Sequence, residues 1–382
     1  MAFETPSEHL GWCYATLPTV SRTFALNIRT LPPPLRRSVT LAYLLFRLAD
    51  TIEDVADLSA EARSVLFAEL TARLTAPDPA APPTPEQAAA RQALLACRPT
   101  EGEAALVRDQ HRLWAAYAAL PGVPRGVLAR WLAESVAGMI SAPAGFTDGP
   151  VKCLETPADL RRYCWYVAGT VGMLLTELFV DHSPGAAARA EALTADAEAF
   201  GRALQLTNIL QDVAADHADG RCYLPRRWLE SAGVPPARLL EPDHRAGGLS
   251  VIRRIAAGAL ADLRAALRYT LTLPAGEWRL RVFCLWPLLA ALRTLGLIVR
   301  GDRVLTAGRR PKITRRRLYQ DMAAAVVLAP FDGLLTRYFE GIVRADFPAG
   351  RRQSLMIFHA SDPDIYHGNA GDGPIRLRPL QG

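Results

Sequence analysis

Two clusters of acidic residues lie inside stretches that are otherwise apolar and helical in character. The first cluster is Asp50-Thr51-Ile52-Glu53-Asp54, and the second covers residues 208–216 with the sequence NILQDVAAD. An unpaired carboxylate buried in such a stretch costs several kcal/mol, so each cluster needs a source of positive charge. The chain can keep these residues in its interior only if something neutralises them.

The spacing of the acids indicates what that source is. In the first cluster the acids are three and four positions apart, and in the second Asn208, Asp212 and Asp216 recur every four positions. On a helix each set lies on one face, with successive side chains roughly 6 Å apart along the axis. Two such faces offer the oxygen ligands that Mg²⁺ prefers, and Mg²⁺ held by few carboxylates completes its shell with phosphate oxygens. We therefore expect a diphosphate site whose metal ligands, for Mg²⁺ or alternatively Mn²⁺, are Asp50, Glu53, Asp54, Asp212 and Asp216.

The rest of the composition favours one all-α domain. Half of the 382 residues are hydrophobic, and the alternating patterns typical of β-strands are scarce. There is no internal repeat, and the Pro/Ala-rich connector at 76–84 is too short to separate two cores. We expect a catalytic domain over 1–345 and an irregular tail over 346–382. The six cysteines show neither CxxC pairs nor zinc spacing, which indicates reduced core residues.

The net charge of the chain limits the classes of partner that we expect it to bind. A net charge of +6 fits phosphate-bearing substrates or an anionic membrane surface, although an Arg-rich solvated surface explains most of it. No nucleic acid is expected, because the basic residues are scattered and no finger or RNA-sheet motif occurs. No signal-type segment is apparent, and the most apolar run, 282–299, is interrupted by Pro287 and Arg293. We expect a soluble cytoplasmic monomer, attached at most peripherally to the inner membrane surface.

Helical periodicity runs through most of the chain. A Leu-Pro-Pro-Pro sequence at 31–34 must end one helix and begin the next. Helices are then predicted at about 35–54, 86–97, 103–119, 124–141, 157–181, 187–216, 250–272, 277–299, 314–324 and 328–345.

Several polar residues accompany the acidic clusters. Tyr43 and Arg47 share the helical stripe of the first cluster, where Arg47 could contact phosphate oxygens or simply pair with a neighbouring acid. Ser21 begins a helix at Ser21-Arg22-Thr23-Phe24, either as a cap alone or, with Arg22, as an anion site. Tyr163, in an apolar helix, is either a hydrogen-bonded core residue or a proton relay. Arg221 follows the second cluster after a turn, either near a phosphate or on the surface.

Taken together, these motifs resemble the squalene/phytoene synthase family of head-to-head prenyltransferases. The resemblance covers roughly residues 12–300 and rests on SRTF, DTIED, YCWYVAGTVG and NILQDVAAD with GRCYLP, in that order. It implies an all-α isoprenoid-synthase bundle around a central apolar cavity, and Mg²⁺-dependent condensation of two prenyl diphosphates through a cyclopropylcarbinyl intermediate. By motif position, it implies that Tyr163 relays the proton and that diphosphate is surrounded by Ser21, Arg22, Phe24, Tyr43, Arg47, Asn208 and Arg221.

Further details resemble the squalene synthases of this family. Phe283 lies in FCLWP, which resembles a segment of squalene synthases that lines the pocket of the second half-reaction. Lys312 and Arg315 lie in PKITRRR, which resembles a stretch associated with NADPH, although a solvated run of charges explains it equally well. The resemblance therefore implies farnesyl diphosphate as substrate and squalene as product.

The second acidic motif departs from the family pattern at two positions. Gln211 stands where an Arg is usual and Ala215 where a Glu is usual, so one phosphate contact and one acid are missing. The alternatives are a phytoene or dehydrosqualene synthase, a presqualene diphosphate or hydroxysqualene synthase of the hopanoid route, and a catalytically inactive scaffold at a membrane.

Overall fold

The computed structural model confirms the all-α fold. It describes residues 5–55, 57–141, 145–147, 149–301 and 303–347. The tail expected at 346–382 therefore lies almost wholly outside the described residues. The helices are α1 (Pro6–Val20), α2 (Arg22–Ile28), α3 (Pro33–Asp54), α4 (Ala60–Thr75), α5 (Pro85–Ala96), α6 (Glu101–Arg108), α7 (Gln110–Ala118), α8 (Gly122–Ser141), α9 (Pro157–Cys164), α10 (Thr170–His182), α11 (Pro184–Ala187), α12 (Ala190–Ala218), α13 (Arg226–Ser231), α14 (Arg245–Thr272), α15 (Trp278–Arg300), α16 (Arg315–Leu328) and α17 (Asp332–Asp346).

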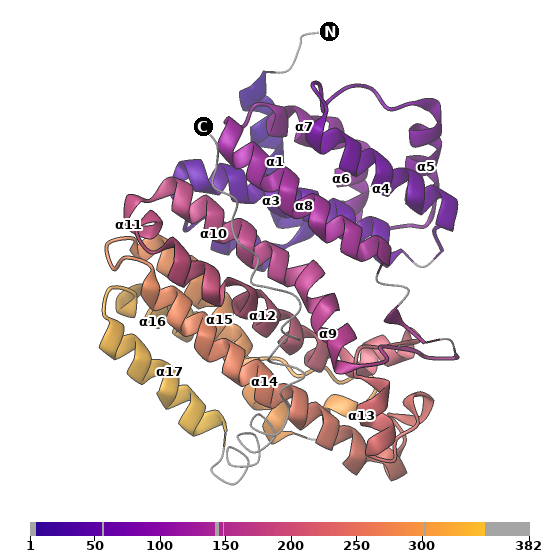
Figure 1. Ribbon diagram of the computed structural model, residues 1–382, viewed down its shortest axis with the longest axis vertical. Helices are drawn as coiled ribbons and strands as arrows, with labels where there is room; N and C mark the ends of the chain where they lie inside the picture. Colours follow the sequence, from indigo (N-terminus) through magenta and orange to yellow (C-terminus); the bar gives the residue numbers. More distant parts are fainter. Residues whose placement is uncertain (1–4, 56, 142–144, 148, 302, 348–382) are drawn as a thin grey trace.

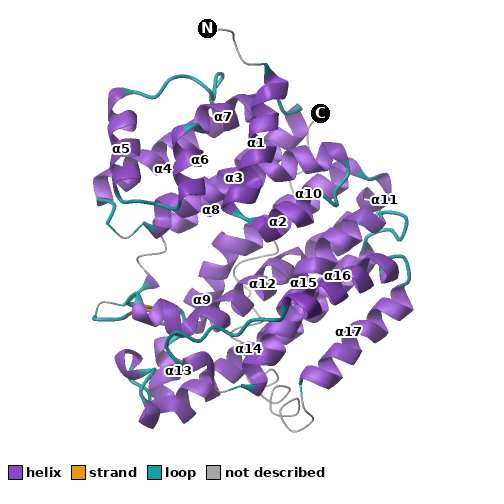
Figure 2. Cartoon of the chain, turned by 180° about the vertical axis from the view of Figure 1, so that it is seen from behind, coloured by secondary structure: helices purple, strands orange, loops and turns teal. Residues whose placement is uncertain are grey.

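Helices α1 to α8 gather in one part of the molecule, and α9 to α17 form the other (Figure 1). Helix α12 lies between α10 and α14, and α15 packs beside α14. Figure 2 shows the same arrangement from behind, with α16 and α17 at the outer edge. Short 3₁₀ turns η3 (Pro236–Arg238), η4 (Pro242–His244) and η5 (Arg303–Leu305) connect the later helices.

A two-residue parallel ladder is the β-structure assigned within the described residues. Strand β1 (Lys152–Cys153) pairs with β2 (Arg221–Cys222), which follows α12 directly after Gly220. Gly220 has a φ of +75°, a conformation that a side chain would strain. The ladder fixes the backbone of Arg221 next to the carboxyl end of α12.

A π-helical turn, η2 (Trp165–Gly169), separates α9 from α10. Its widened hydrogen bonding frees the carbonyl of Tyr166, which accepts hydrogen bonds from the hydroxyls of Ser135 at 2.7 Å and Thr170 at 2.9 Å. π-turns inside helices frequently mark functional sites. The 157–181 helix expected from the sequence is therefore divided at the glycine-rich motif.

Glycines allow α10 and η2 to touch α12. A Cβ on Gly172 would lie 2.2 Å from the carbonyl oxygen of Ala197, and a Cβ on Gly201 would lie 2.1 Å from that of Ala168. These distances leave no space for a side chain, so the two backbones approach each other only because both positions are glycine. This answers why glycine interrupts these apolar helices.

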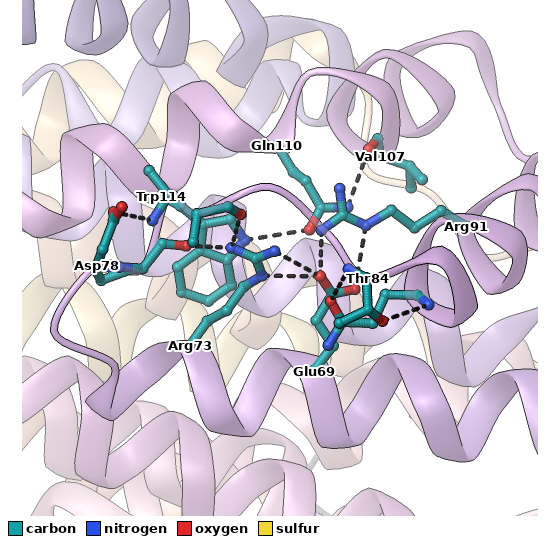
Figure 3. A network of polar contacts seen from close by, with 12 residues as sticks. Glu69, Arg73, Asp78, Thr84, Arg91, Val107, Gln110 and Trp114 are labelled. Atoms are coloured by element: carbon teal, nitrogen blue, oxygen red, sulfur yellow. Dashed lines mark hydrogen bonds and ion pairs between the residues drawn. The ribbon is translucent and has the colours of Figure 1, made fainter.

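A buried ionic cluster holds the helices of the first part together (Figure 3). Glu69, which is 4% exposed, accepts hydrogen bonds from Arg73 at 2.9 Å and from Arg91 at 3.2 Å. Beside it, Gln110 accepts the indole N–H of Trp114 at 3.2 Å. Because two guanidinium groups hold one buried carboxylate, this cluster joins α4 to α5 and leaves the carboxylate of Glu69 fully paired.

Two helices bear on the expectation that no segment spans a membrane. Pro157–His182 and Trp278–Arg300 are both long and apolar enough by length and composition, but the second is 78% buried inside the fold. It also contains Arg281 and Arg293, each buried with acidic partners. Core helices pass the same test, so the finding leaves the localisation open.

Candidate active site

Helix α3 presents the first acidic cluster together with its arginine and tyrosine. Arg47 donates a hydrogen bond from Nη2 to the phenol oxygen of Tyr43 at 3.1 Å, and its Nη1 lies 3.8 Å from Glu103 of α6. The Tyr43 ring lies 5.3 Å from that of Phe24. Ser21 caps α2 by accepting the backbone N–H of Phe24 at 3.3 Å. Arg22, the first residue of α2, is exposed.

Burial is the main influence on the acids of α3. It raises the pKa of Asp50 to about 7 against the opposing charge of Arg47. Burial, with the charges of Asp54 and Asp50, raises the pKa of Glu53 to about 8. Burial also raises the pKa of Asp54 against the opposing effects of Arg221 and Arg47. The carboxylates at this end of α3 are therefore poorly solvated.

Helix α12 presents the second set. Burial, with the charges of Asp212 and Asp219, raises the pKa of Asp216 to about 7 against the opposing effects of Arg221 and Arg310. Burial raises the pKa of Asp212 too, but Arg310 counteracts it. Asn208 is exposed on the same helix. Of the two acids of α12, Asp216 is therefore the one whose pKa a neighbouring carboxylate raises.

Arg221 connects the two acidic sets. Its Nη1 lies 3.8 Å from Oδ1 of Asp54, and its charge also lowers the pKa of Asp216. The guanidinium donates a hydrogen bond to the phenol of Tyr223, two residues further along the chain. The carboxyl ends of α3 and α12 therefore lie beside the same arginine. This position favours the prediction that Arg221 lies near a phosphate over the alternative that it is a surface residue.

Tyr163 lies next to Tyr223, the tyrosine that Arg221 contacts. The two phenol rings are 4.8 Å apart and the hydroxyls are hydrogen-bonded. Burial raises the pKa of Tyr163 well above its ordinary value, and the charges of Glu53 and Asp54 contribute. Sequence reasoning missed Tyr223, although it lies in the quoted GRCYLP motif.

A second missed residue is Arg310, which comes from the segment between α15 and α16. Its Nε lies 2.5 Å from Oδ1 of Asp212, and its Nη2 donates to Oδ2 at 2.6 Å, a bidentate pair. Gln211 holds the same segment by donating to the carbonyl of Pro311. A guanidinium therefore lies next to the second acidic cluster, but it comes from a residue about a hundred positions later, which local sequence spacing could not predict.

A cavity of about 680 Å³ opens beside this pair and has a basic lining. Lys312 lines it, whereas Arg315 is the exposed first residue of α16 and is not among the lining residues. The cationic residues around the cavity are Arg300, Arg303, Arg309, Arg310 and Lys312.

Phe283 belongs to the core. It is 5% exposed, its ring meets that of Phe179 edge-on at 6.0 Å, and its carbonyl accepts a hydrogen bond from Asn27 at 3.0 Å. Its catalytic role stays a prediction.

The carboxylates of the two acidic clusters fit a metal site only in part. Within the described residues, no group of three or more His, Cys, Asp or Glu side chains is gathered closely enough to hold an ion alone. Mg²⁺, however, is commonly bound by one or two carboxylates plus water and phosphate oxygens, and burial raises the carboxyl pKa values here because it removes water from the charged form, which a bound cation would favour. The residues present therefore fit an ion that arrives with a diphosphate, and metal binding stays a prediction.

Comparisons with known proteins give the family context. The family model described as squalene/phytoene synthase matches residues 17–317. The squalene synthase of Eremothecium gossypii is 30% identical over 302 residues, which cover 78% of this chain and 64% of that protein. A solved structure of TcSQS with a ligand superimposes with a TM-score of 0.73 at 24% identity, covering 92% of this chain and 97% of the other. A dehydrosqualene synthase in complex with a ligand gives a TM-score of 0.60 at 19% identity, covering 84% and 96%.

Proposed function

Because this chain belongs to the squalene/phytoene synthase family, we propose that it condenses two molecules of farnesyl diphosphate, by way of presqualene diphosphate, to squalene. The match spans 64% of the squalene synthase of Eremothecium gossypii, so the activity of the whole protein is part of the proposal. The first half-reaction joins the two C15 chains and expels one diphosphate. The second expels the remaining diphosphate and accepts a hydride.

The observation that carries this proposal is the position of Arg221. It lies 3.8 Å from Asp54, the last acid of the first cluster, and acts electrostatically on Asp216, the last acid of the second. A diphosphate brought to this point meets carboxylates on two sides, which require bridging cations, and guanidinium groups that bind its oxygens directly.

The chain's own residues have separable tasks in expelling diphosphate. Arg47, Arg221 and Arg310 hold phosphate oxygens through charge-assisted hydrogen bonds, each worth about 1.5–3 kcal/mol. For Arg310 this requires that its guanidinium leave Asp212 when the ligand enters. Ser21 and Arg22 lie at the start of α2, where backbone N–H groups favour an anion.

The proton that is lost when the two chains join passes to Tyr163. Tyr163 is a neutral phenol, so it accepts this proton only as it gives its own phenolic proton to Tyr223, whose proton goes to an oxygen of the departing diphosphate. Arg221 stays protonated throughout and orients the phenol of Tyr223. Aromatic rings such as Phe24, Tyr43 and Phe283 stabilise positive charge without acting as bases.

Two cofactors are part of the proposal. Mg²⁺, held by Asp50, Glu53, Asp54, Asp212 and Asp216 together with diphosphate, would neutralise the leaving group. NADPH would use the basic cavity beside Asp212, where Lys312 and neighbouring arginines suit its phosphates.

Product analysis tests the proposal. The protein is incubated with farnesyl diphosphate and Mg²⁺, with and without NADPH, and the products are identified by gas chromatography and mass spectrometry. We expect squalene only when NADPH is present, and presqualene diphosphate to accumulate without it. Squalene formed equally without NADPH would refute the hydride step.

The departures at Gln211 and Ala215 favour one second candidate, a presqualene diphosphate synthase that completes only the first half-reaction. Presqualene diphosphate as the end product in the presence of NADPH would establish it. Dehydrosqualene, hydroxysqualene or phytoene would each identify a different member of the family, and no product with any prenyl diphosphate would leave a binding protein.

A further inference from the structure

The turn between α16 and α17 carries a group of apolar side chains on its outer surface. Val327 is 67% exposed, Phe331 55%, Leu334 49% and Val326 42%. Single exposed apolar residues are normal, but several on one turn mark an interaction site. Helix α17 lies along the outer edge of the molecule in both views (Figures 1 and 2).

The inner side of this helical hairpin is firmly attached to α15. Buried Arg281 donates hydrogen bonds to the carbonyl of Ala329 at 2.8 Å and to Oδ1 of Asp332 at 2.5 Å. Buried Arg293 donates to Asp321 at 3.0 Å and to Asp346 at 2.9 Å. Because these pairs fix both helices, the outer apolar side chains cannot rotate into the core.

The outer side of α16 changes from basic to apolar along its length. Arg315, Arg316 and Arg317 occupy the first turn, which contains no acid, although positive charge at a helix N-terminus is unfavourable. From Arg316 the exposed face continues to Val327, roughly 16 Å further along the helix. An external anionic surface would offset the unfavourable interaction of these arginines with the N-terminus of α16.

The same gradient continues around the turn onto α17. Tyr319, on the exposed face of α16, is 60% exposed, and Arg337 is exposed one turn beyond Leu334. The acid at the tip, Asp332, is already paired with Arg281, so it does not repel an anionic partner as a free carboxylate would.

We propose that this surface, hereafter the hairpin surface, docks on an anionic lipid bilayer. The apolar tip would enter the acyl region, and the arginines would meet lipid phosphates. The hairpin surface consists of Arg316, Tyr319, Val326, Val327, Phe331, Leu334 and Arg337. Interfacial helices with this division of charge bind bilayers through buried apolar area plus attraction to anionic headgroups.

A bilayer is favoured over a protein partner for two reasons. The basic border complements an anionic headgroup layer. The proposed function also yields a C30 hydrocarbon that water does not dissolve, so a lipid phase must receive it; the inference rests on the proposed function for this reason alone.

Vesicle flotation of the full chain without substrate tests the docking. Vesicles contain phosphatidylcholine alone or with phosphatidylglycerol. We expect binding to the mixed vesicles, a loss of more than tenfold in the double variant Val327→Asp with Phe331→Asp, and a change of less than twofold in Ile140→Asp. Ile140 is a matched control, since it is 58% exposed but lies on α8. The milder pair Val327→Ser with Phe331→Ser covers the case in which the aspartates disturb folding.

Charge reversal provides the second arm. Arg316→Glu with Arg337→Glu should weaken binding to the mixed vesicles by about fivefold or more per arginine and remove its salt dependence. Binding unchanged in both sets of variants would overturn the proposal. So would loss of a dimer in the apolar variants with unchanged vesicle binding, because the hairpin surface would then join two copies of this chain. Product formation in detergent is measured separately, so its absence would count against the proposed function and not against the docking.

Discussion

Replacing Glu53 by Gln should stabilise the metal-free protein while it removes activity. Glu53 ends α3 beside Asp50 and Asp54, and burial together with these acids raises its pKa to about 8 from 4.5. Between these two values the folded chain holds a proton that the unfolded chain releases. The free energy of unfolding of the wild type therefore falls as the pH rises from about 4.5 to about 8.

The size of the effect follows from the same values. The difference between 4.5 and about 8 corresponds to at most about 5 kcal/mol. Partial exposure and screening reduce this to about 1–3 kcal/mol. Gln does not titrate, so the free energy of unfolding of Glu53→Gln does not fall in this way. It should exceed that of the wild type by about 1–3 kcal/mol at pH 8 and equal it near pH 5.

Urea unfolding followed by circular dichroism, in EDTA and at several pH values, measures the difference. Asp50 and Asp216 titrate in both proteins, so the difference between the two proteins reports the charge of Glu53 together with its interaction with Asp50 and Asp54. Glu86→Gln, which changes an exposed acid in the first turn of α5, is the matched control and should run parallel to the wild type. Parallel curves for Glu53→Gln would refute the argument that uncompensated charge destabilises this site. Release of diphosphate from farnesyl diphosphate should fall at least tenfold in the same variant.

Three further substitutions test other parts of the structure. Arg310→Gln should lower kcat/KM for farnesyl diphosphate about 10- to 100-fold, which corresponds to the loss of one charge-assisted contact. Arg309→Gln, in the same cavity lining, should change kcat/KM of this first half-reaction less than twofold. Equal effects of the two substitutions would contradict a specific role for Arg310. Tyr223→Phe should slow diphosphate release about tenfold and alter the pH profile without raising KM, and an unchanged profile would exclude it from the proton path. Gly201→Ala should destabilise the fold by more than about 3 kcal/mol in thermal unfolding, because its Cβ would lie 2.1 Å from a carbonyl oxygen, while Gly11→Ala, with open space around it, should be neutral or stabilising.

Much of the fold could be predicted from apolar periodicity. The predicted helices at 86–97, 124–141, 250–272 and 277–299 agree with α5, α8, α14 and α15 within a few residues. Helices α1 and α4 are not among the predicted ranges. The continuous helix expected at 103–119 is interrupted at Asp109, which belongs to neither α6 nor α7.

The candidate site was predictable where it depends on spacing within one helix. The stripes of α3 and α12 are of this kind, and so is the cap at Ser21. Arg310 reaches Asp212 only through tertiary folding, so no sequence periodicity predicts this contact. The ladder that fixes Arg221 has two residues per strand, too few for an alternating pattern. Tyr223 could have been proposed from its motif, but its pairing with Tyr163 depends on how α9 meets β2.

The glycine contacts between α10, η2 and α12 limit how this protein can be redesigned. Positions 172 and 201 face backbone oxygens at 2.2 and 2.1 Å, so even one added methyl group meets an atom that cannot move aside. Libraries that aim at longer or shorter isoprenoid products should leave this seam constant. Variation belongs instead at positions outside this seam.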